Sequence, residues 1–322
     1  TADGADGVNE VSYLILETMD ELTLLQPSSN VQISRKNPHN FLRKACEISR
    51  KGLGQPAFYN TESIVQELLN AGKSIHDARQ GGASGCVETG AFGKEAYILT
   101  GYLNLPKILE LALSDGFDKK CGRQLGPHTG NAAGFKSFDD LFTAFRQQLH
   151  YFVDVKVQGN SIIEKLYASQ MPVPFLSVVV EDCIGKGRDY NAGGARYNTS
   201  YIQGVGIGTL TDSLAAIKYN VFDRQHFSMA ELLAALDADF SGYETLYRLV
   251  REKTPKYGND DDYADELMTR AFQAYYDEVT GRPNCRGGHY RIDMLPTTCH
   301  VYFGAVTGAT ATLSTATPGI TI

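Results

Sequence analysis

A glycine-framed loop places a cysteine and a glutamate two residues apart. The run reads Gly81-Gly-Ala-Ser-Gly-Cys-Val-Glu-Thr-Gly90, and its reactive side chains are Cys86 and Glu88. In an extended segment the side chains of residues i and i+2 point to the same side, so we expect Cys86 and Glu88 to face one ligand together. The glycines remove side-chain bulk and permit unusual backbone angles, which lets the tip of the loop approach a substrate closely.

Two chemistries fit this pair. A nucleophilic thiolate needs a nearby histidine or a helix N-terminus that favours the ionised sulfur, and the nearest histidine in the sequence is His76. A neighbouring carboxylate disfavours the ionised sulfur instead. In the second chemistry the sulfur carries a hydrogen atom in one-electron steps while Glu88 moves a proton, which requires no thiolate. The carboxylate neighbour therefore favours the second chemistry.

A purely structural role is the alternative for the same run. Cysteine is commonly buried in folded proteins. The loop also fits a buried Cys86 in a tight glycine turn, with Glu88 capping a helix that follows. The spacing alone leaves both interpretations open.

The elements that must position this loop are mostly helices. Apolar residues recur at the helical period over residues 9–25, 38–51, 61–79, 106–113, 137–168, 209–221, 228–238, 243–253 and 260–279. Strands are expected at 30–34 and 299–304, and glycine-rich connections at 81–93, 185–194 and 204–208. Long helices separated by short strands and glycine loops favour an α/β architecture, barrel-like or layered, with helix in excess. We find no internal repeat and no domain boundary in the sequence.

Composition excludes several classes of function. The 322 residues include 30 Lys and Arg against 37 Asp and Glu, which leaves a net charge of −7. This balance argues against a surface for nucleic acid or anionic membrane, since such surfaces need a basic excess. No apolar stretch approaches the ~20 residues of a membrane span. The six cysteines show no CxxC spacing, so we expect free thiols in a reducing cytoplasm and no metal site.

The cysteine loop resembles that of a known enzyme family. The segment Gly85-Cys-Val-Glu-Thr-Gly-Ala-Phe-Gly-Lys-Glu-Ala-Tyr-Ile-Leu-Thr-Gly-Tyr102 is similar to the cysteine loop of the glycyl radical enzymes, the pyruvate formate-lyase superfamily. Further matches follow in family order, among them Pro174-Phe-Leu-Ser177, Asp182-Cys-Ile-Gly-Lys-Gly-Arg-Asp189, Gly193-Gly-Ala-Arg-Tyr-Asn198 and Gly208-Thr-Leu-Thr-Asp-Ser-Leu-Ala-Ala-Ile-Lys218. The resemblance implies part of the family's ten-stranded α/β barrel, its second half-barrel, over residues 1–310. Residues 311–322 form an atypical tail rich in Thr and Ala.

The amino-acid sequence of the loop narrows the resemblance to one branch of the family. A single cysteine followed by Val-Glu is typical of the dehydratases and carbon–nitrogen lyases, whereas pyruvate formate-lyases have two adjacent cysteines. Choline- and glycerol-type members place proline after the glutamate, but here Thr89 follows Glu88. This pattern most resembles the branch that dehydrates trans-4-hydroxy-L-proline. A choline- or diol-type lyase is the alternative within the family.

The resemblance implies a concrete mechanism. A protein glycyl radical, generated by a radical S-adenosylmethionine activating enzyme, would oxidise Cys86 to a thiyl radical. The thiyl radical would take a hydrogen atom from the substrate carbon next to nitrogen, and Glu88 would transfer the proton that lets water leave. The expected product is a pyrroline carboxylate. Tyr102 matches a tyrosine that lines the substrate pocket, where its hydroxyl can hydrogen-bond the substrate. The full-length enzyme is expected to be a homodimer.

Parts of the family pattern are missing from the sequence. The short segment around the radical glycine, an Arg-Val-x-Gly-Tyr-like run, does not occur, and neither does the large N-terminal portion. We therefore expect a central fragment that binds no cofactor itself and is inactive alone. The alternatives from other classes are a non-catalytic interaction fragment and an enzyme that uses Cys86 as a thiolate.

Two further residue sets favour structural roles. Arg196 and Tyr197 in the GGARYN run are expected to shape a loop rather than to bind a substrate carboxylate. Cys299 and His300 would lie on a strand and point to opposite faces, so they cannot share a ligand.

Overall fold

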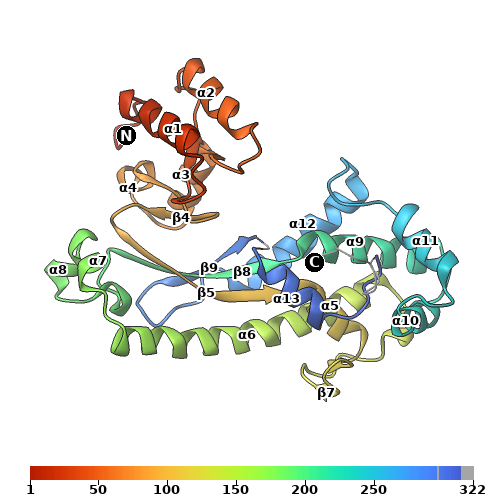
Figure 1. Cartoon of the computed structure of the whole chain (residues 1–322). Coiled ribbons are helices and arrows are strands. Elements are labelled where there is room, and N and C mark those ends of the chain that lie inside the picture. The colour runs from red at the N-terminus through yellow and green to blue at the C-terminus, as the bar shows by residue number, and fades with distance from the viewer. Residues whose placement is uncertain (296, 313–322) are drawn as a thin grey trace. The chain divides into compact units, whose positions relative to one another are not determined.

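The computed structural model describes residues 1–295 and 297–312 and divides the chain into two compact units (Figure 1). Unit 1 contains residues 1–97 and 166–199, and unit 2 contains residues 98–165 and those from 200 onward. The chain passes between the units inside three regular elements, which are β5 (Glu95–Asn104), α6 (Phe138–Gln170) and β8 (Tyr197–Val205). Because the chain crosses between the units inside helices and strands, no segment with the composition of a linker marks the boundary. The sequence therefore gave no sign of two units.

Unit 1 combines small helices with two strand pairs. Its elements are α1 (Glu10–Leu22), β1 (Asn30–Ile33), α2 (His39–Ser49), β2 (Ala57–Asn60), α3 (Thr61–Asn70), α4 (Ile75–Arg79), β3 (Gly81–Ser84), β4 (Glu88–Ala91), α7 (Pro174–Val179) and α8 (Cys183–Lys186). β1 and β2 are parallel, whereas β3 and β4 form an antiparallel hairpin. Leu68 of α3 and Ala78 of α4 pack against Ala83 of β3 in a small apolar core, so the hairpin rests on helices of its own unit.

The helix expected over residues 61–79 is interrupted. α3 ends at Asn70, and Gly72 takes a left-handed backbone angle (φ 81°) that the helix cannot continue through. The Ser74 side chain then accepts a hydrogen bond from the backbone N–H of Asp77 and starts α4. The turn between the two helices redirects the chain into β3.

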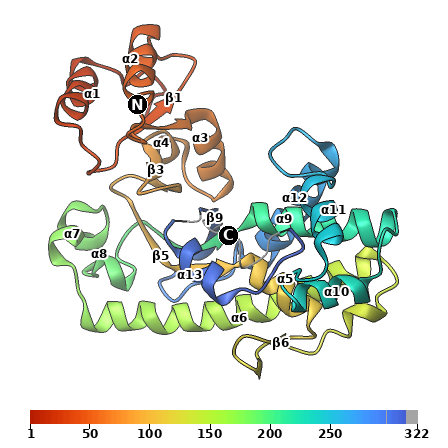
Figure 2. The same ribbon diagram turned by 45° about the vertical axis from the view of Figure 1, so that its right-hand side comes forward.

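Unit 2 is built around a three-stranded sheet in the order β5-β8-β9, with β9 at His289–Met294. The long helix α6 runs beside this sheet in both views (Figures 1 and 2), and its Phe145 and Leu149 share one apolar core with Ile202 of β8. The remaining strands and α-helices are α5 (Leu105–Leu113), β6 (Phe117–Asp118), β7 (Arg123–Gln124), α9 (Ile207–Ile217), α10 (Met229–Asp237), α11 (Glu244–Glu252), α12 (Asp262–Val279) and α13 (Cys299–Val306). α9 packs against both α5 and α12.

One element was assigned the wrong type from the sequence. The expected strand at 299–304 is the helix α13. A short apolar run does not distinguish a strand from a helix by its periodicity alone. The end of α13 is held by a distant side chain, since the Asn104 amide donates to the backbone oxygen of Phe303 and to the Thr307 hydroxyl. Cys299 and His300 are therefore successive residues of a helix and do not point to opposite faces of a strand.

The tail predicted over 311–322 lies, from residue 313 on, outside the described residues. In the part of the chain that the structure describes, no helix has the length and apolar character needed to cross a bilayer. Within residues 1–295 and 297–312, no cluster of His, Cys, Asp and Glu side chains is arranged to hold a metal ion.

Candidate active site

Cys86 lies at the tip of the β3–β4 hairpin. Ser84 pairs with Glu88 across the strands, and residues 85–87 form the connecting turn. Gly85 enters this turn with φ at 62°, a left-handed angle that glycine adopts without strain. Cys86 is exposed, and Glu88 begins a strand. The structure therefore contradicts both the fully extended loop and the alternative of a buried cysteine with a helix-capping glutamate.

The Glu88 carboxylate folds back onto the turn. Its Oε2 accepts hydrogen bonds from the backbone N–H groups of Cys86 and Val87, each 3.1 Å long. The Glu88 side chain is otherwise buried. These two bonds shape the turn and keep the Glu88 carboxylate beside the backbone of Cys86. That the two side chains face one ligand together stays a prediction.

Tyr59 contributes a contact that the sequence did not indicate. Its hydroxyl, at the end of β2, donates to the backbone oxygen of Cys86. Burial raises the pKa of Tyr59, and the nearby Cys86 and Glu88 side chains raise it further. The phenol therefore stays protonated near neutral pH and remains a donor. No sequence motif links Tyr59 to the loop, because the two segments meet only in the folded unit.

Two glycines of the hairpin lie so close to neighbouring side chains that a larger residue would not fit. Gly82 and Gly90 pair across the strands. A Cβ atom on Gly82 would lie 2.4 Å from Nε2 of Gln32 and 2.7 Å from the ring of Phe92, and one on Gly90 would lie 2.3 Å from the ring of Tyr97. These side chains therefore occupy the space that a larger residue would need. The close approach that the glycines permit is, at these two positions, to side chains of the same chain.

Replacing Gly90 by alanine is expected to destabilise unit 1 by about 1–3 kcal/mol, because the new methyl group must displace the Tyr97 ring. Urea unfolding followed by circular dichroism measures the change. Gly7→Ala is the matched control, since nothing lies within 4 Å of a Cβ atom at Gly7 and its backbone angle is ordinary. Equal stability of the two variants would contradict this packing argument.

A buried ion pair holds the end of β4. Lys73 Nζ lies 3.0 Å from Glu95 Oε1, and the two side chains are 2% and 0% exposed. The other carboxylate oxygen of Glu95 accepts from the backbone N–H of Ala91 at 2.8 Å, and Thr199 donates its hydroxyl to Glu95. Ala91 is the last residue of β4, so the ion pair is connected directly to the strand that carries Glu88.

A second charged group in unit 1 centres on Asp77. Lys94 Nζ lies 2.7 Å from one carboxylate oxygen of Asp77, and the Tyr197 hydroxyl donates to the other at 2.8 Å. Arg196 contacts Asp77 as well as Glu181, at 3.4 and 2.6 Å. Arg196 and Tyr197 thus connect the GGARYN run to α4, which is the loop-shaping role expected for them.

The stability of unit 1 should fall in acid because of Asp77. Burial acts to raise its pKa, but the hydrogen bonds from Lys94, Tyr197 and Ser74 outweigh burial and hold the pKa of Asp77 well below its usual range. A carboxyl with a lowered folded pKa adds stability above its unfolded pKa of about 3.9, and this stability is lost as the pH falls toward the folded value. We expect Asp77→Asn to flatten the pH dependence of the free energy of unfolding below about pH 5. A pH dependence of Asp77→Asn equal to that of the unsubstituted chain would contradict this account of Asp77.

Tyr102, the predicted substrate-binding residue, lies on β5 in unit 2 and is half-buried. The structure therefore brings Cys86 and Glu88 together in unit 1, whereas Tyr102 belongs to the other unit. Beside it, a Cβ atom on Gly101 would lie 2.1 Å from Nζ of Lys156, which projects from α6. Burial lowers the pKa of Lys156. No motif in the sequence distinguishes this lysine from the other charged residues of α6.

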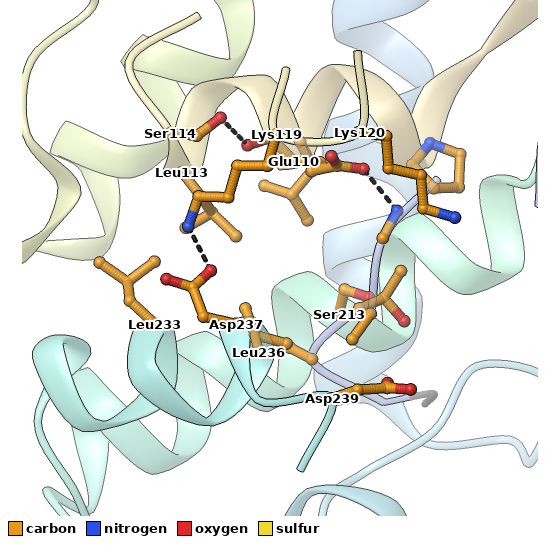
Figure 3. Close-up of a pocket in the computed structure, with 16 residues that line it drawn as sticks. Glu110, Leu113, Ser114, Lys119, Lys120, Ser213, Leu233, Leu236, Asp237 and Asp239 are labelled. Atoms are coloured by element: carbon orange, nitrogen blue, oxygen red, sulfur yellow. Dashed lines mark hydrogen bonds and ion pairs between the residues drawn. The ribbon is translucent and has the colours of Figure 1, made fainter. Parts of the chain in front are cut away.

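A cavity of about 240 Å³ lies elsewhere in unit 2, between α5, α10 and residues 308–311 (Figure 3). Lys119 forms an ion pair with Asp237 across it, and Glu110 accepts from the backbone N–H of Gly308 at 2.8 Å. Cys86, Glu88 and Tyr102 do not line this cavity. It is therefore not the candidate active site.

Comparison with known proteins decides the family. A family model described as pyruvate formate lyase-like matches residues 1–304. The chain belongs to the pyruvate formate lyase-like family. It is 66% identical over 307 residues to trans-4-hydroxy-L-proline dehydratase of Clostridioides difficile, a match that covers 95% of this chain and 39% of that protein. Members of this family thus include a dehydratase with close sequence similarity to almost the whole chain.

Solved structures show the same fold. The crystal structure of the C. difficile hydroxyproline dehydratase with trans-4-hydroxy-L-proline bound superposes with a TM-score of 0.95, covering 97% of this chain and 39% of that one. The glycerol-bound B12-independent glycerol dehydratase of Clostridium butyricum superposes with a TM-score of 0.93 at 40% identity, covering 98% and 40%. The expected helix-rich α/β fold of the glycyl radical enzymes is confirmed. The chain spans about two fifths of the length of these relatives.

Proposed function

We propose that this chain is the cysteine-bearing part of a glycyl radical dehydratase, and that the complete enzyme removes water from trans-4-hydroxy-L-proline. The observation that carries the proposal is the Cys86–Glu88 hairpin, in which the Glu88 carboxylate accepts from the backbone N–H of Cys86 and the Cys86 side chain is exposed and in no disulfide. The 66% identity to a hydroxyproline dehydratase supports the choice of substrate.

The residues present fit the radical chemistry of the family. When the complete enzyme carries its glycyl radical, that group supplies a one-electron oxidising equivalent. In this chain the receiving group is Cys86, whose thiol is exposed and forms no disulfide. We expect the Cys86 sulfur to take a hydrogen atom from the substrate carbon next to nitrogen and to return it after dehydration. Because the hydrogen atom is returned, no net oxidant is consumed.

In this proposal Glu88 is the proton donor. The leaving hydroxyl needs one proton to depart as water, and we propose that Glu88 in its protonated form supplies it from a position beside the Cys86 backbone. The substrate nitrogen loses one proton as the C=N bond of the product forms, so the net loss from the substrate is one water molecule. Tyr59 and the two turn amides hold the Cys86–Glu88 geometry. Tyr102 is proposed to hydrogen-bond the substrate through its hydroxyl.

The partners of the complete enzyme are part of the same proposal. Family membership supports a radical S-adenosylmethionine activating enzyme, a small-molecule substrate and a homodimer. We place the reaction in the cytoplasm, because none of the six cysteines forms a disulfide, which is the usual state in a reducing compartment.

A chimera tests the proposed function directly. This chain replaces the matching 307 residues of the C. difficile hydroxyproline dehydratase, and the product is activated under anaerobic conditions by that enzyme's own activating partner. Electron paramagnetic resonance measures the glycyl radical, and product assays measure pyrroline carboxylate formed from trans-4-hydroxy-L-proline. The intact relative serves as the positive control. A chimera that carries the radical but dehydrates only glycerol or propanediol, or cleaves choline, would favour the alternative substrates instead.

A further inference from the structure

The cavity in unit 2 has largely apolar walls (Figure 3). Its sides are formed by leucines of two helices and by the segment after α13, namely Leu109 and Leu113 of α5, Leu233 and Leu236 of α10, and Ala309. An engineered apolar cavity of about 150 Å³ binds benzene, so a cavity of about 240 Å³ has room for a larger ring system. The size and the walls favour a small, mostly apolar ligand.

The charged groups at the cavity are paired within the protein. One carboxylate oxygen of Glu110 accepts from Lys107 at 2.8 Å, and the other accepts from the backbone N–H of Gly308 at 2.8 Å. Lys119 forms its ion pair with Asp237. These contacts occupy both oxygens of Glu110 and neutralise the charge of Asp237.

The two remaining charged groups also have partners. Lys120 donates to the backbone oxygen of Ala305 at 2.8 Å, and Asp239 is not free either. A charged ligand would have to break such contacts, or enter an apolar space without a counter-charge, which is costly. An uncharged ligand would leave all of them intact. The electrostatics of the cavity therefore favour an uncharged occupant.

Ser213 of α9 adds a polar group that has no partner. It lines the cavity and is 1% exposed, and no other group of the described residues forms a hydrogen bond with its Oγ. Buried hydroxyls nearly always have a hydrogen-bond partner. A serine oxygen can accept from an N–H or O–H group. The Ser213 hydroxyl is thus available to anchor one polar group of a ligand.

We propose that this cavity is a binding site for a small uncharged ring compound that carries one N–H or O–H group. The ring lies between the leucines of α5 and α10, and its polar hydrogen is donated to Oγ of Ser213. All residues that line the cavity belong to unit 2, and none of them has a role in the proposed dehydration. The inference therefore stands or falls independently of the proposed function.

Indole is a suitable probe for this site, because the chain contains no tryptophan. Light at the long-wavelength edge of the indole absorption band excites the probe without exciting the tyrosines of the protein. Titration of indole with the chain should give a saturable rise in fluorescence anisotropy, with one indole bound per chain. Absence of saturable binding would overturn the proposal.

Variants that fill the cavity locate the bound indole. Ala309→Phe places a ring in the cavity from the segment after α13, and Leu236→Phe enlarges the side chain on the α10 wall. Circular dichroism identifies the variants that fold, and each of these should bind indole at least tenfold more weakly. Ala230→Phe, at an exposed position of α10 outside the cavity, is the matched control and should bind indole normally. Equal affinities of a folded filled variant and the control would place indole elsewhere and refute the site.

Two analogues test the chemistry of recognition. Indene has the ring shape of indole but no N–H, and it should bind about 3- to 10-fold more weakly, as the loss of one hydrogen bond implies. Ser213→Ala should abolish this preference without lowering the free energy of unfolding, because the Ser213 hydroxyl has no partner to lose. Indole-3-carboxylate should bind at least tenfold more weakly than indole, since Lys119 and Lys120 already have acceptors. A preference that persists in Ser213→Ala, or a carboxylate that binds as tightly as indole, would refute the assigned class of ligand.

Discussion

Replacing Cys86 by serine should abolish dehydration of trans-4-hydroxy-L-proline by the activated chimera, with a loss of at least about a thousandfold. Serine preserves the size of the side chain and leaves the contacts of Glu88 and Tyr59 with the Cys86 backbone intact. Its O–H bond is much stronger than the S–H bond of cysteine, so the hydrogen atom is not removed from the serine hydroxyl and no radical forms there to react with the substrate carbon. The initial rate of pyrroline carboxylate formation measures the effect.

The controls separate chemistry from folding. Cys121→Ser replaces another exposed cysteine and should retain turnover. The Cys86→Ser chimera should still show the glycyl radical signal and an unchanged unfolding midpoint, because neither depends on the sulfur at this position. Substantial turnover by Cys86→Ser would show that the thiol is not the hydrogen-atom carrier.

Replacing Lys73 by methionine should produce the largest loss of stability that we expect from a single polar residue, about 3–5 kcal/mol. The substitution removes the cation that lies 3.0 Å from Glu95 and leaves the Glu95 carboxylate fully buried without it. Breaking a buried pair costs this much because the remaining charge has been withdrawn from water. Since Glu95 also accepts from Ala91, we expect β4 to loosen along with the hairpin.

Urea unfolding of the chain measures this loss, and two variants make it specific. Lys51→Met removes an exposed cation that pairs with the half-buried Asp20 and should cost less than about 1 kcal/mol. The double variant Lys73→Met with Glu95→Gln should recover part of the loss, because a neutral amide can still accept from Ala91 without burying a charge. A Lys73→Met variant as stable as Lys51→Met would refute the account of the buried pair.

Much of the secondary structure followed from local sequence. The helical period predicted α6 and α12 nearly to their observed ends, because a face that repeats every 3.6 residues has only one regular way to be buried. The local pattern did not predict the structure where a contact with a distant residue determines it. The run at 299–304 became a helix whose end is held by Asn104, and the crossing between units occurs inside β5, α6 and β8, where composition does not change.

The cysteine loop shows the same division between sequence and tertiary structure. By itself the sequence determined that Cys86 and Glu88 lie near each other, and its motifs identified the family, since both are properties of neighbouring residues along the chain. Only the tertiary structure decided how the pair is arranged. The hairpin turns Glu88 back onto the amides of Cys86 and Val87, and Tyr59 and the Lys73–Glu95 pair reach the hairpin from elsewhere in unit 1. Hydrogen bonds and buried charges between separated segments exist only once the chain is folded, so no spacing along the sequence specifies them.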